Sequence, residues 1–356
     1  MRKLDALRKI AFSNEGFDGY LISNSVNLLY FLGFQGASSL FVPAEGECIV
    51  YVYGVNYEQA KVECKDLKVE QVKADENLIM KIARQVKAQK TRKLAVDSLS
   101  VAGWQTLVKE FPKENMLEIN NGYIETLRRV KDVHEIELMR KAGELTSEGM
   151  KAAYETIKPG VKEYAVAAEI EYAMRKHGAG ALAFETIVAS GTHSAFPHGG
   201  CSDRTIQDGD LVIVDIGATC NYYCSDMTRT IVAGKPSAQQ EKIYNVVKGA
   251  QEKAFQTIKA GAIIADVDTV ARKVIEAAGY GDYFVHRLGH GVGLEVHEPP
   301  SLSHLNKDLL IEGNVVTNEP GIYICNYGGV RIEDTVLVKT NGAEKLTTGP
   351  YSLTTE

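Results

Sequence analysis

An internal repeat in the second half of this 356-residue chain limits the folds that the chain can adopt. The sequence AYETIKPG at residues 153–160 is followed 101 positions later by AFQTIKAG at residues 254–261. The sequence GDLVIVDIG at residues 209–217 similarly resembles GNVVTNEPG at residues 313–321, 104 positions later. We therefore expect a domain of two related halves, arranged about a pseudo-two-fold axis.

Each half of the repeat carries two carboxylates at matching positions. Asp215 matches Glu319, and Asp226 and Glu333, 107 positions apart, are each followed two residues later by threonine. Asp215 interrupts an apolar run that otherwise reads as an interior strand, where an isolated ionised carboxylate would carry a large desolvation cost. His290 lies between two glycines. The best joint explanation of these five side chains is a buried pair of metal ions.

The spacing of the two aspartates predicts their arrangement. Asp215 and Asp226 are 11 residues apart and are separated by GATCNY, which is typical of a turn region. This spacing suits two adjacent antiparallel strands that present both carboxylates to one face. Helices are then expected to cover the opposite face.

The length of the chain predicts two domains, because it exceeds the size of a typical single domain. Residues 1–122 alternate helical and strand-like stretches and are expected to form an α/β domain. Residues 123–356 are expected to form an α+β domain with the ligands on strands. Its helices are predicted from a capping pair, Asp132 and Glu135, to about residue 157, and over residues 163–177, 238–259 and 265–278.

Composition and charge exclude several classes of protein. A net charge of −6 argues against a nucleic-acid partner, which normally leaves a basic surface. The amphipathic start at residues 1–10 lacks the apolar segment of a signal peptide, and no run approaches the ~18 apolar residues of a membrane span. We therefore predict a cytoplasmic protein without membrane contact. The six cysteines lack zinc or redox spacing and are expected to be reduced thiols: Cys48, Cys64, Cys201, Cys220, Cys224 and Cys325.

The motifs around the five candidate ligands resemble those of the pita-bread metallopeptidases. The motifs are VDIG at Asp215, SDMTRT at Asp226, GHGVG at His290, NEPGIY at Glu319 and VRIEDT at Glu333. The likeness covers about residues 125–350 and is strongest to Xaa-Pro dipeptidases (prolidases) and Xaa-Pro aminopeptidases. It implies a C-terminal domain of two related α/β halves around a curved antiparallel sheet, preceded by the N-terminal domain of that subfamily.

The resemblance implies a dinuclear metal centre in each subunit. An oxygen-rich set with one histidine suits manganese, cobalt, iron or zinc, and the resemblance favours manganese or cobalt. By resemblance, Asp215 binds one ion, His290 binds the other, and Asp226 and Glu333 bridge both. A water between the ions supplies a bridging hydroxide near neutral pH. Glu319 binds one ion and moves the proton from this water to the leaving nitrogen.

Other residues receive roles from the same resemblance. His198 and His297 match two active-site histidines that bind the substrate carbonyl and stabilise the tetrahedral intermediate, where a placed donor is worth ~3 kcal/mol. Arg331 is either a partner of a metal-binding carboxylate or part of an ordinary ion pair. His286 either lines the pocket or has a structural role, and Tyr323 is interpreted as a packing residue.

The resemblance leaves the substrate open between two peptide classes. Some prolidases carry an arginine four residues after the equivalent of His297, and this chain has Ser301 there. The leading prediction is hydrolysis of Xaa-Pro dipeptides, and the alternative is an Xaa-Pro aminopeptidase that accepts longer peptides. A methionine aminopeptidase is disfavoured because such enzymes generally lack a domain like residues 1–122. A non-catalytic peptide-binding module is the alternative of another class, and the resemblance also implies a homodimer.

Overall fold

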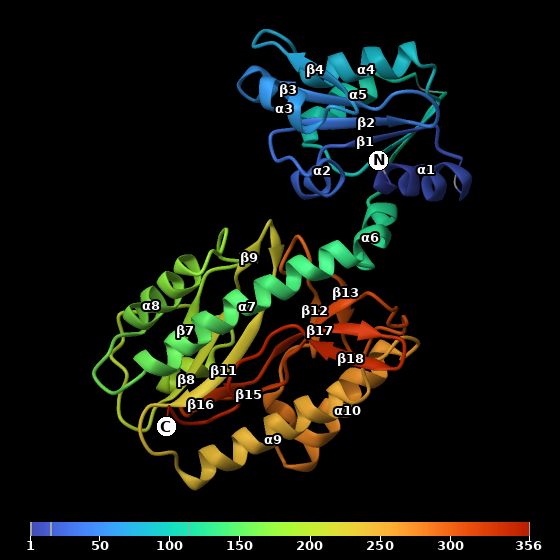
Figure 1. Ribbon diagram of the computed structural model, residues 1–356. Helices are drawn as coiled ribbons and strands as arrows, with labels where there is room; N and C mark the ends of the chain where they lie inside the picture. The colour runs from blue at the N-terminus through green and yellow to red at the C-terminus, as the bar shows by residue number, and fades with distance from the viewer. Residues whose placement is uncertain (1, 15, 113, 356) are drawn as a thin grey trace. The chain divides into compact units, whose positions relative to one another are not determined.

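The protein folds into two compact units, Met1–Arg128 and Arg129–Glu356 (Figure 1). The structure is a computed structural model that describes residues 2–14, 16–112 and 114–355. Met1, the first residue of the amphipathic start at residues 1–10, for which the sequence pattern predicts a helix, lies outside this range. The chain passes from one unit to the other within α6 (Gly122–Arg129).

The first unit is an α/β domain built on a six-stranded mixed sheet, as the sequence predicts. The strand order is β4-β3-β2-β1-β5-β6, with β1 antiparallel to β2 and parallel to β5. Leu21, Phe41 and Val96 of the sheet pack against Ile82 and Leu107 of the helices. The strands are β1 (Gly19–Ile22), β2 (Ser39–Pro43), β3 (Ile49–Tyr53), β4 (Lys68–Val72), β5 (Lys93–Val96) and β6 (Met116–Ile119). The helices are α1 (Arg2–Asn14), α2 (Ser25–Leu32), η1 (Gly54–Asn56), α3 (Tyr57–Glu63), α4 (Leu78–Ala88) and α5 (Val101–Glu110).

The first half of the second unit packs two helices on a three-stranded antiparallel sheet of order β11-β8-β7. Val212, Val214 and Ile216 of β8 contact the helices in one core cluster, so that the alternate residue Asp215 faces the other side of the sheet. Asp132 caps the first helix together with Glu135, as predicted. The elements are α7 (Val133–Thr156), α8 (Glu163–Lys176), β7 (Ile187–Ser190), η2 (Gly191–Ala195), β8 (Leu211–Ile216), β9 (Thr219–Cys220), β10 (Tyr223–Cys224) and β11 (Met227–Val232).

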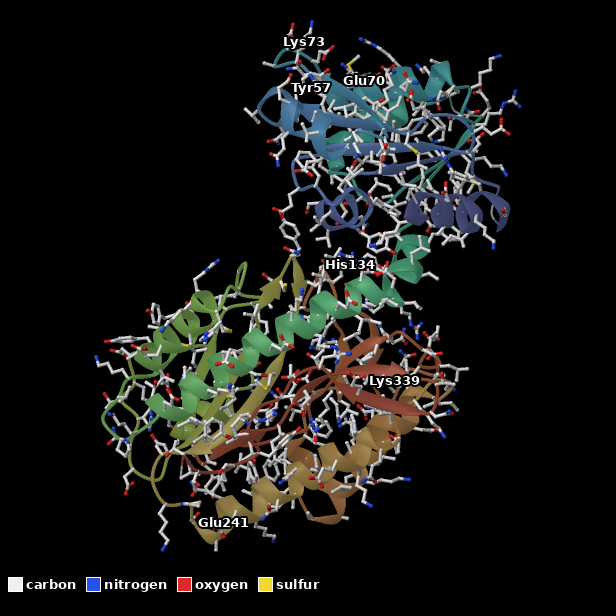
Figure 2. The ribbon with its side chains drawn as sticks, in the orientation of Figure 1. Tyr57, Glu70, Lys73, His134, Glu241 and Lys339 are labelled. Atoms are coloured by element: carbon white, nitrogen blue, oxygen red, sulfur yellow. The ribbon has the colours of Figure 1, made fainter. Side chains whose placement is uncertain are left out.

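The second half repeats this arrangement around a five-stranded sheet of order β13-β12-β14-β17-β18. Val316 of β14 and Val336 of β17 share a core with Val247 and Ala271 of the two helices. Exposed charges such as Glu241 cover the outer surface of these helices (Figure 2). The elements are α9 (Ala238–Phe255), α10 (Ile264–Ala277), η3 (Gly281–Tyr283), β12 (Gly289–Gly291), β13 (Glu298–Leu302), β14 (Val315–Asn318), β15 (Gly321–Ile324), β16 (Gly328–Arg331), β17 (Asp334–Lys339) and β18 (Gly342–Lys345).

The two halves contact each other through the matching carboxylate positions. Thr228 Oγ1 donates to Glu333 Oε2 at 2.6 Å, and Thr335 Oγ1 exchanges hydrogen bonds with the backbone of Asp226 at 2.8 and 3.0 Å. Each threonine of the repeat therefore contacts the carboxylate residue of the other half. The expected packing of two related halves is confirmed in this pair of contacts.

One predicted helix is shorter than expected. We predicted a helix over residues 238–259, but α9 ends at Phe255. Beyond it, the amides of Thr257 and Ile258 donate to carbonyls three residues earlier, so the chain tightens and leaves the α-helical path. This turn places Ile258 in the core, which an amphipathic helical pattern alone does not distinguish from a further helical turn.

Candidate metal centre and active site

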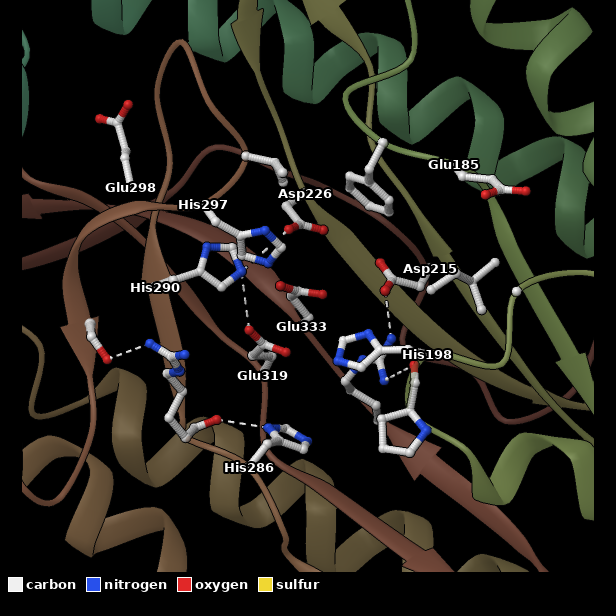
Figure 3. A pocket seen from close by; sticks show the side chains of 18 of the residues that line it. Glu185, His198, Asp215, Asp226, His286, His290, His297, Glu298, Glu319 and Glu333 are labelled. Atoms are coloured by element: carbon white, nitrogen blue, oxygen red, sulfur yellow. Dashed lines mark hydrogen bonds and ion pairs between the residues drawn. The ribbon is translucent and has the colours of Figure 1, made fainter. Parts of the chain in front are cut away.

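A cavity of about 840 Å³ in the second unit collects every site residue that the sequence predicts (Figure 3). Its lining also includes apolar side chains such as Phe184, Ile187 and Val296. The predicted residues that line it are His198, Asp215, Asp226, His286, His290, His297, Glu319, Arg331 and Glu333.

Strand geometry brings the five candidate ligands to this cavity. Asp215 is on β8, and Asp226 immediately precedes β11. These strands are antiparallel with Thr228 opposite Asp215, so Asp226, two residues before Thr228, lies on the same face as Asp215, as predicted. In the second half, Glu319 follows β14 and Glu333 precedes β17.

Three of these side chains already have the spacing of a metal site. Ligand atoms of Asp226, His290 and Glu333 all lie within 4.8 Å of one another, and all three residues are buried. His290 Nε2 lies 3.6 Å from Asp226 Oδ2 and 3.3 Å from Glu319 Oε1. His290 Nδ1 lies 3.1 Å from the carbonyl oxygen of Gly291, and a proton donated there would leave Nε2 free to bind a metal ion.

The carboxylates hold oxygens that the protein does not satisfy. Asp215 Oδ1, Asp226 Oδ1 and Glu333 Oε1 are buried and have no hydrogen-bond partner within the described chain. A buried oxygen of this kind costs free energy unless a ligand compensates it. Three such oxygens around one cavity fit a site for positive ions, and their hard oxygen chemistry fits divalent metals.

The pKa values of the candidate carboxylate ligands also indicate a site for positive ions. Burial, together with the neighbouring carboxylates, raises the pKa of Asp226 and of Glu333 well above the usual range. Burial also acts to raise the pKa of Glu319, but the hydrogen bond and charge of His290 outweigh it and hold that pKa at about 2. Glu319 is therefore an ionised carboxylate, whereas Asp226 and Glu333 lack sufficient positive charge nearby.

Arg331 of β16 binds the candidate ligand Asp215 and three further residues. Its Nη2 donates to Asp215 Oδ2 at 2.5 Å, and its Nε donates to Thr228 Oγ1 at 3.1 Å. Its Nη1 donates to the Tyr323 hydroxyl at 2.8 Å and to the carbonyl of Pro197 at 3.3 Å. Arg331 is thus a partner of the carboxylate of Asp215 rather than a surface ion pair.

The two candidate catalytic histidines face the cluster from different segments. The ring of His297 lies 4.2 Å, centroid to centroid, from the ring of His290. Burial and then the nearby His290 lower the pKa of His297, which favours its neutral form. His198 follows Pro197, whose carbonyl is bound by Arg331, so β16 also restrains the loop that carries His198.

The structure assigns contacts that the sequence did not reveal. Tyr323, interpreted as a packing residue, is buried but also bonds through its hydroxyl to Arg331 and, at 3.0 Å, to His286 Nε2. Glu163 of α8 receives hydrogen bonds from the backbone and side chain of Ser190 and Ser202 and from His193. An acidic residue in the first turn of a helix usually serves that helix, so the sequence carried no signal for this role.

The fold and the cavity together define a metallopeptidase. The chain belongs to metallopeptidase family M24, whose model matches residues 137–340, and the creatinase/prolidase N-terminal domain matches residues 3–130. The family resemblance and the fold predicted from the motifs are therefore confirmed.

Individual relatives match nearly the whole chain. The chain is 43% identical over 351 residues to the Xaa-Pro dipeptidase of Pyrococcus furiosus, covering 97% of each protein. It superposes on an Xaa-Pro dipeptidase from Bacillus anthracis with a TM-score of 0.94 at 36% identity, covering 99% of both chains. An X-Pro aminopeptidase from Thermotoga maritima matches with a TM-score of 0.87 at 37% identity, covering 95% of this chain and 97% of the other.

Proposed function

We propose that this protein is a dinuclear metal-dependent exopeptidase that hydrolyses the bond between an N-terminal residue and a following proline, with dipeptides as its preferred substrates. The observation that carries the proposal is the set of three unsatisfied carboxylate oxygens beside His290 in one buried cavity. The high identity to an Xaa-Pro dipeptidase over nearly the full length supports the choice of substrate.

We assign the metal ligands to Asp215, Asp226, His290, Glu319 and Glu333. Asp215 and His290 would each serve a different ion, and Asp226 and Glu333 would serve both. Manganese or cobalt is proposed first, and zinc or iron also suits the donor set. Such ions would lower the pKa of a bound water and so would supply hydroxide near neutral pH.

The remaining steps fall to side chains of the chain itself. Glu319, ionised in the cavity, accepts the proton of the attacking water and delivers it to the leaving proline nitrogen. His198 and His297 hydrogen-bond to the substrate carbonyl and to the negative charge that develops on its oxygen. Arg331 keeps Asp215 and the His198 loop in place during these steps.

A comparison of two peptides tests the proposal. The rate of Ala-Pro hydrolysis is compared with that of Ala-Pro-Ala after loading with manganese or cobalt, and Asp226→Asn is the control for metal-dependent chemistry. Cleavage of the dipeptide alone supports a dipeptidase. Equal or faster cleavage of the tripeptide makes the protein an Xaa-Pro aminopeptidase, the alternative that the likeness to the Thermotoga maritima structure favours. Binding of either peptide without hydrolysis by the metal-loaded protein indicates a non-catalytic binding module.

Location and assembly remain predictions from the sequence. None of the helices within the described ranges combines the length and apolar composition that a bilayer span requires. A homodimer is proposed on the resemblance alone, a cytoplasmic location stays a prediction from the sequence pattern, and small proline-containing peptides are the expected partners.

A further inference from the structure

Arg287 is a cation at the cavity without a carboxylate partner. It lies in the segment between η3 and β12 and lines the cavity with an exposed side chain. Its Nη1 donates to Ser301 Oγ on β13 at 2.9 Å. Within the described chain, no Asp or Glu oxygen lies within ion-pair distance of its guanidinium, and its Nε and Nη2 make no hydrogen bond.

Arg331 and Glu298, two other charged residues of the lining, are already engaged. All three guanidinium nitrogens of Arg331 are bound to groups of the protein. Glu298 forms a buried ion pair with Lys131 at 2.8 Å and so is not a partner for Arg287. Arg287 is therefore the guanidinium of the lining that keeps two nitrogens, Nε and Nη2, without a protein partner among the described residues.

We propose that Arg287, held by Ser301, is a substrate-binding residue that receives a carboxylate of the peptide. The planar fork of a guanidinium matches the two oxygens of a carboxylate and forms short, charge-assisted bonds. The Ser301 hydroxyl accepts from Arg287 and keeps its own proton to donate to the same carboxylate. This inference rests on the proposed peptidase function and names the group that sets its specificity.

A substrate can supply this carboxylate in two ways. One is the C-terminal carboxylate of a dipeptide, and the other is the acidic side chain of the first residue. A C-terminal carboxylate is displaced by about 3.5 Å for each added residue, so its recognition selects against longer peptides. Recognition of an acidic side chain selects the first residue instead and leaves peptide length free.

Four peptides separate the two sources: Ala-Pro, Ala-Pro amide, Glu-Pro and Gln-Pro. Values of kcat and KM are measured on manganese-loaded wild type, Arg287→Gln, Arg287→Lys and Ser301→Ala. Lys307→Gln is the matched control because it removes an exposed positive charge outside the cavity lining. Equilibrium binding of the same peptides to the same proteins is measured by calorimetry.

If Arg287 binds the C-terminal carboxylate, Arg287→Gln should raise the KM for Ala-Pro about tenfold or more. The KM for Ala-Pro amide should stay unchanged. If Arg287 instead binds an acidic side chain, Arg287→Gln should lose the preference for Glu-Pro over Gln-Pro. The KM values for Ala-Pro and Ala-Pro amide should then stay as in wild type. Arg287→Lys and Ser301→Ala are expected to give intermediate values, since the first keeps charge and the second keeps the guanidinium.

Several results would overturn the inference. It fails if Arg287→Gln changes all four peptides by the same factor, or if it behaves like Lys307→Gln. If the peptides are hydrolysed without any charge preference, the inference fails and the peptidase proposal stands. If no peptide is hydrolysed but binding shows an Arg287-dependent carboxylate preference, the peptidase proposal fails and the inference stands. If the peptides are neither hydrolysed nor bound, the peptidase proposal and the Arg287 inference both fail.

Discussion

At the scale of single residues, the site contains buried carboxylates that the protein alone does not compensate. Asp226 and Glu333 each place a buried oxygen without a partner in the cavity, and the pKa of each is raised by burial and by neighbouring carboxylates. Such groups destabilise the metal-free fold. A buried carboxylate costs free energy when it is ionised without a partner, and it also costs free energy when it must take up a proton to become neutral. Metal binding at these proposed ligands would relieve this cost and release the protons.

Replacement of Asp226 by Asn is therefore expected to make the free energy of unfolding largely independent of manganese. In wild type, manganese at 100 times its dissociation constant should stabilise the fold by about 2.7 kcal/mol for each site of that affinity. Asp226→Asn should lose most of this stabilisation, while its metal-free form is at least as stable as metal-free wild type. Thermal unfolding with and without manganese measures both quantities.

The matched control for this experiment is Glu185→Gln, which alters an exposed carboxylate of the cavity lining outside the five proposed ligands. It should keep the full response to manganese. An unchanged response in Asp226→Asn would show that this carboxylate does not bind the ion.

The proposed ligands were visible in the sequence because charged residues are rare inside apolar segments. Asp215 stands out in its strand for that reason. Its contact with Arg331 was left open, and the hydrogen bond from Thr228 to Glu333 was not foreseen. Both depend on the register between segments about 100 residues apart, which the spacing of residues along the chain does not encode.

At the scale of secondary-structure elements, α8 and η2 jointly support the loop of His198. The buried Glu163 carboxylate of α8 accepts from His193 Nδ1 at 3.0 Å, and His193 Nε2 lies 3.1 Å from the carbonyl of Gly199. Both ring nitrogens thus lie within hydrogen-bond distance of an oxygen. The chain of contacts runs from a helix to the residue that follows His198.

Replacement of Glu163 by Gln should lower stability in a pH-dependent manner. Burial raises the pKa of Glu163, but hydrogen bonds from Ser202, Ser190 and His193 outweigh it, so the pKa in the folded protein lies below the usual value. A lowered folded pKa adds stability above the unfolded pKa of about 4.3, and this stability is lost as pH falls through the folded pKa.

Denaturant unfolding of Glu163→Gln at two pH values checks this sign. At pH 7 the variant should be less stable than wild type by about 2 kcal/mol, the scale of hydrogen bonds to a charged group. At a pH below 4 the difference should shrink. A difference that is constant with pH would mean that the charge of Glu163 contributes nothing.

Replacement of His193 by Phe should impair catalysis through the position of His198. The phenyl ring keeps most of the volume but removes the donor to Gly199, so the loop gains freedom. We expect kcat to fall about tenfold, because small misplacements of catalytic groups are costly, while the number of bound metal ions stays the same. The control is His177→Phe, a change at an exposed histidine at the end of α8.

Equal kcat values for the His193 and His177 variants would contradict a positioning role. The sequence offered no way to assign it, since His193 reads as one of several loop histidines. The α8 helix itself was predicted within one residue of its observed end at Lys176. Helical periodicity and capping are local signals, whereas the target of Glu163 lies on other elements.

At the scale of the whole molecule, a buried ion pair ties the two halves of the catalytic unit. Arg229 of β11 contacts Asp334 of β17 at 2.9 Å, and both side chains are completely buried. Arg229 Nη1 also donates to the carbonyl of Glu333 at 2.6 Å. The pair therefore lies directly behind the proposed ligands and fixes one half against the other.

Replacement of Arg229 by Met should destabilise the protein by about 3 kcal/mol, because it leaves Asp334 buried with less positive charge. Lys345 Nζ, 3.0 Å from Asp334, supplies the remaining compensation. The control is Arg140→Met, which breaks an ion pair to Glu344 that is partly exposed and should cost less than about 1 kcal/mol. Denaturant unfolding of both variants measures the difference, and similar losses would contradict the argument.

The two related halves of the catalytic unit were predictable from its repeated segments, since similar sequences within a chain imply similar local folds. The contacts of Thr228 with Glu333 and of Thr335 with Asp226 were not predictable, because they depend on how the two halves pack against each other. The repeat also explains why the proposed carboxylate ligands come in matching pairs, since each half supplies two of them at corresponding positions in the sequence.

The central claim of a dinuclear centre is tested most directly by counting metal ions. Protein equilibrated with manganese and freed of excess ion should contain two ions per chain by elemental analysis. Asp226→Asn and Glu333→Gln should contain fewer, and Glu185→Gln should retain two. A wild-type value of zero or one, or an unchanged value in both ligand variants, would contradict the assignment of these carboxylates to a pair of ions.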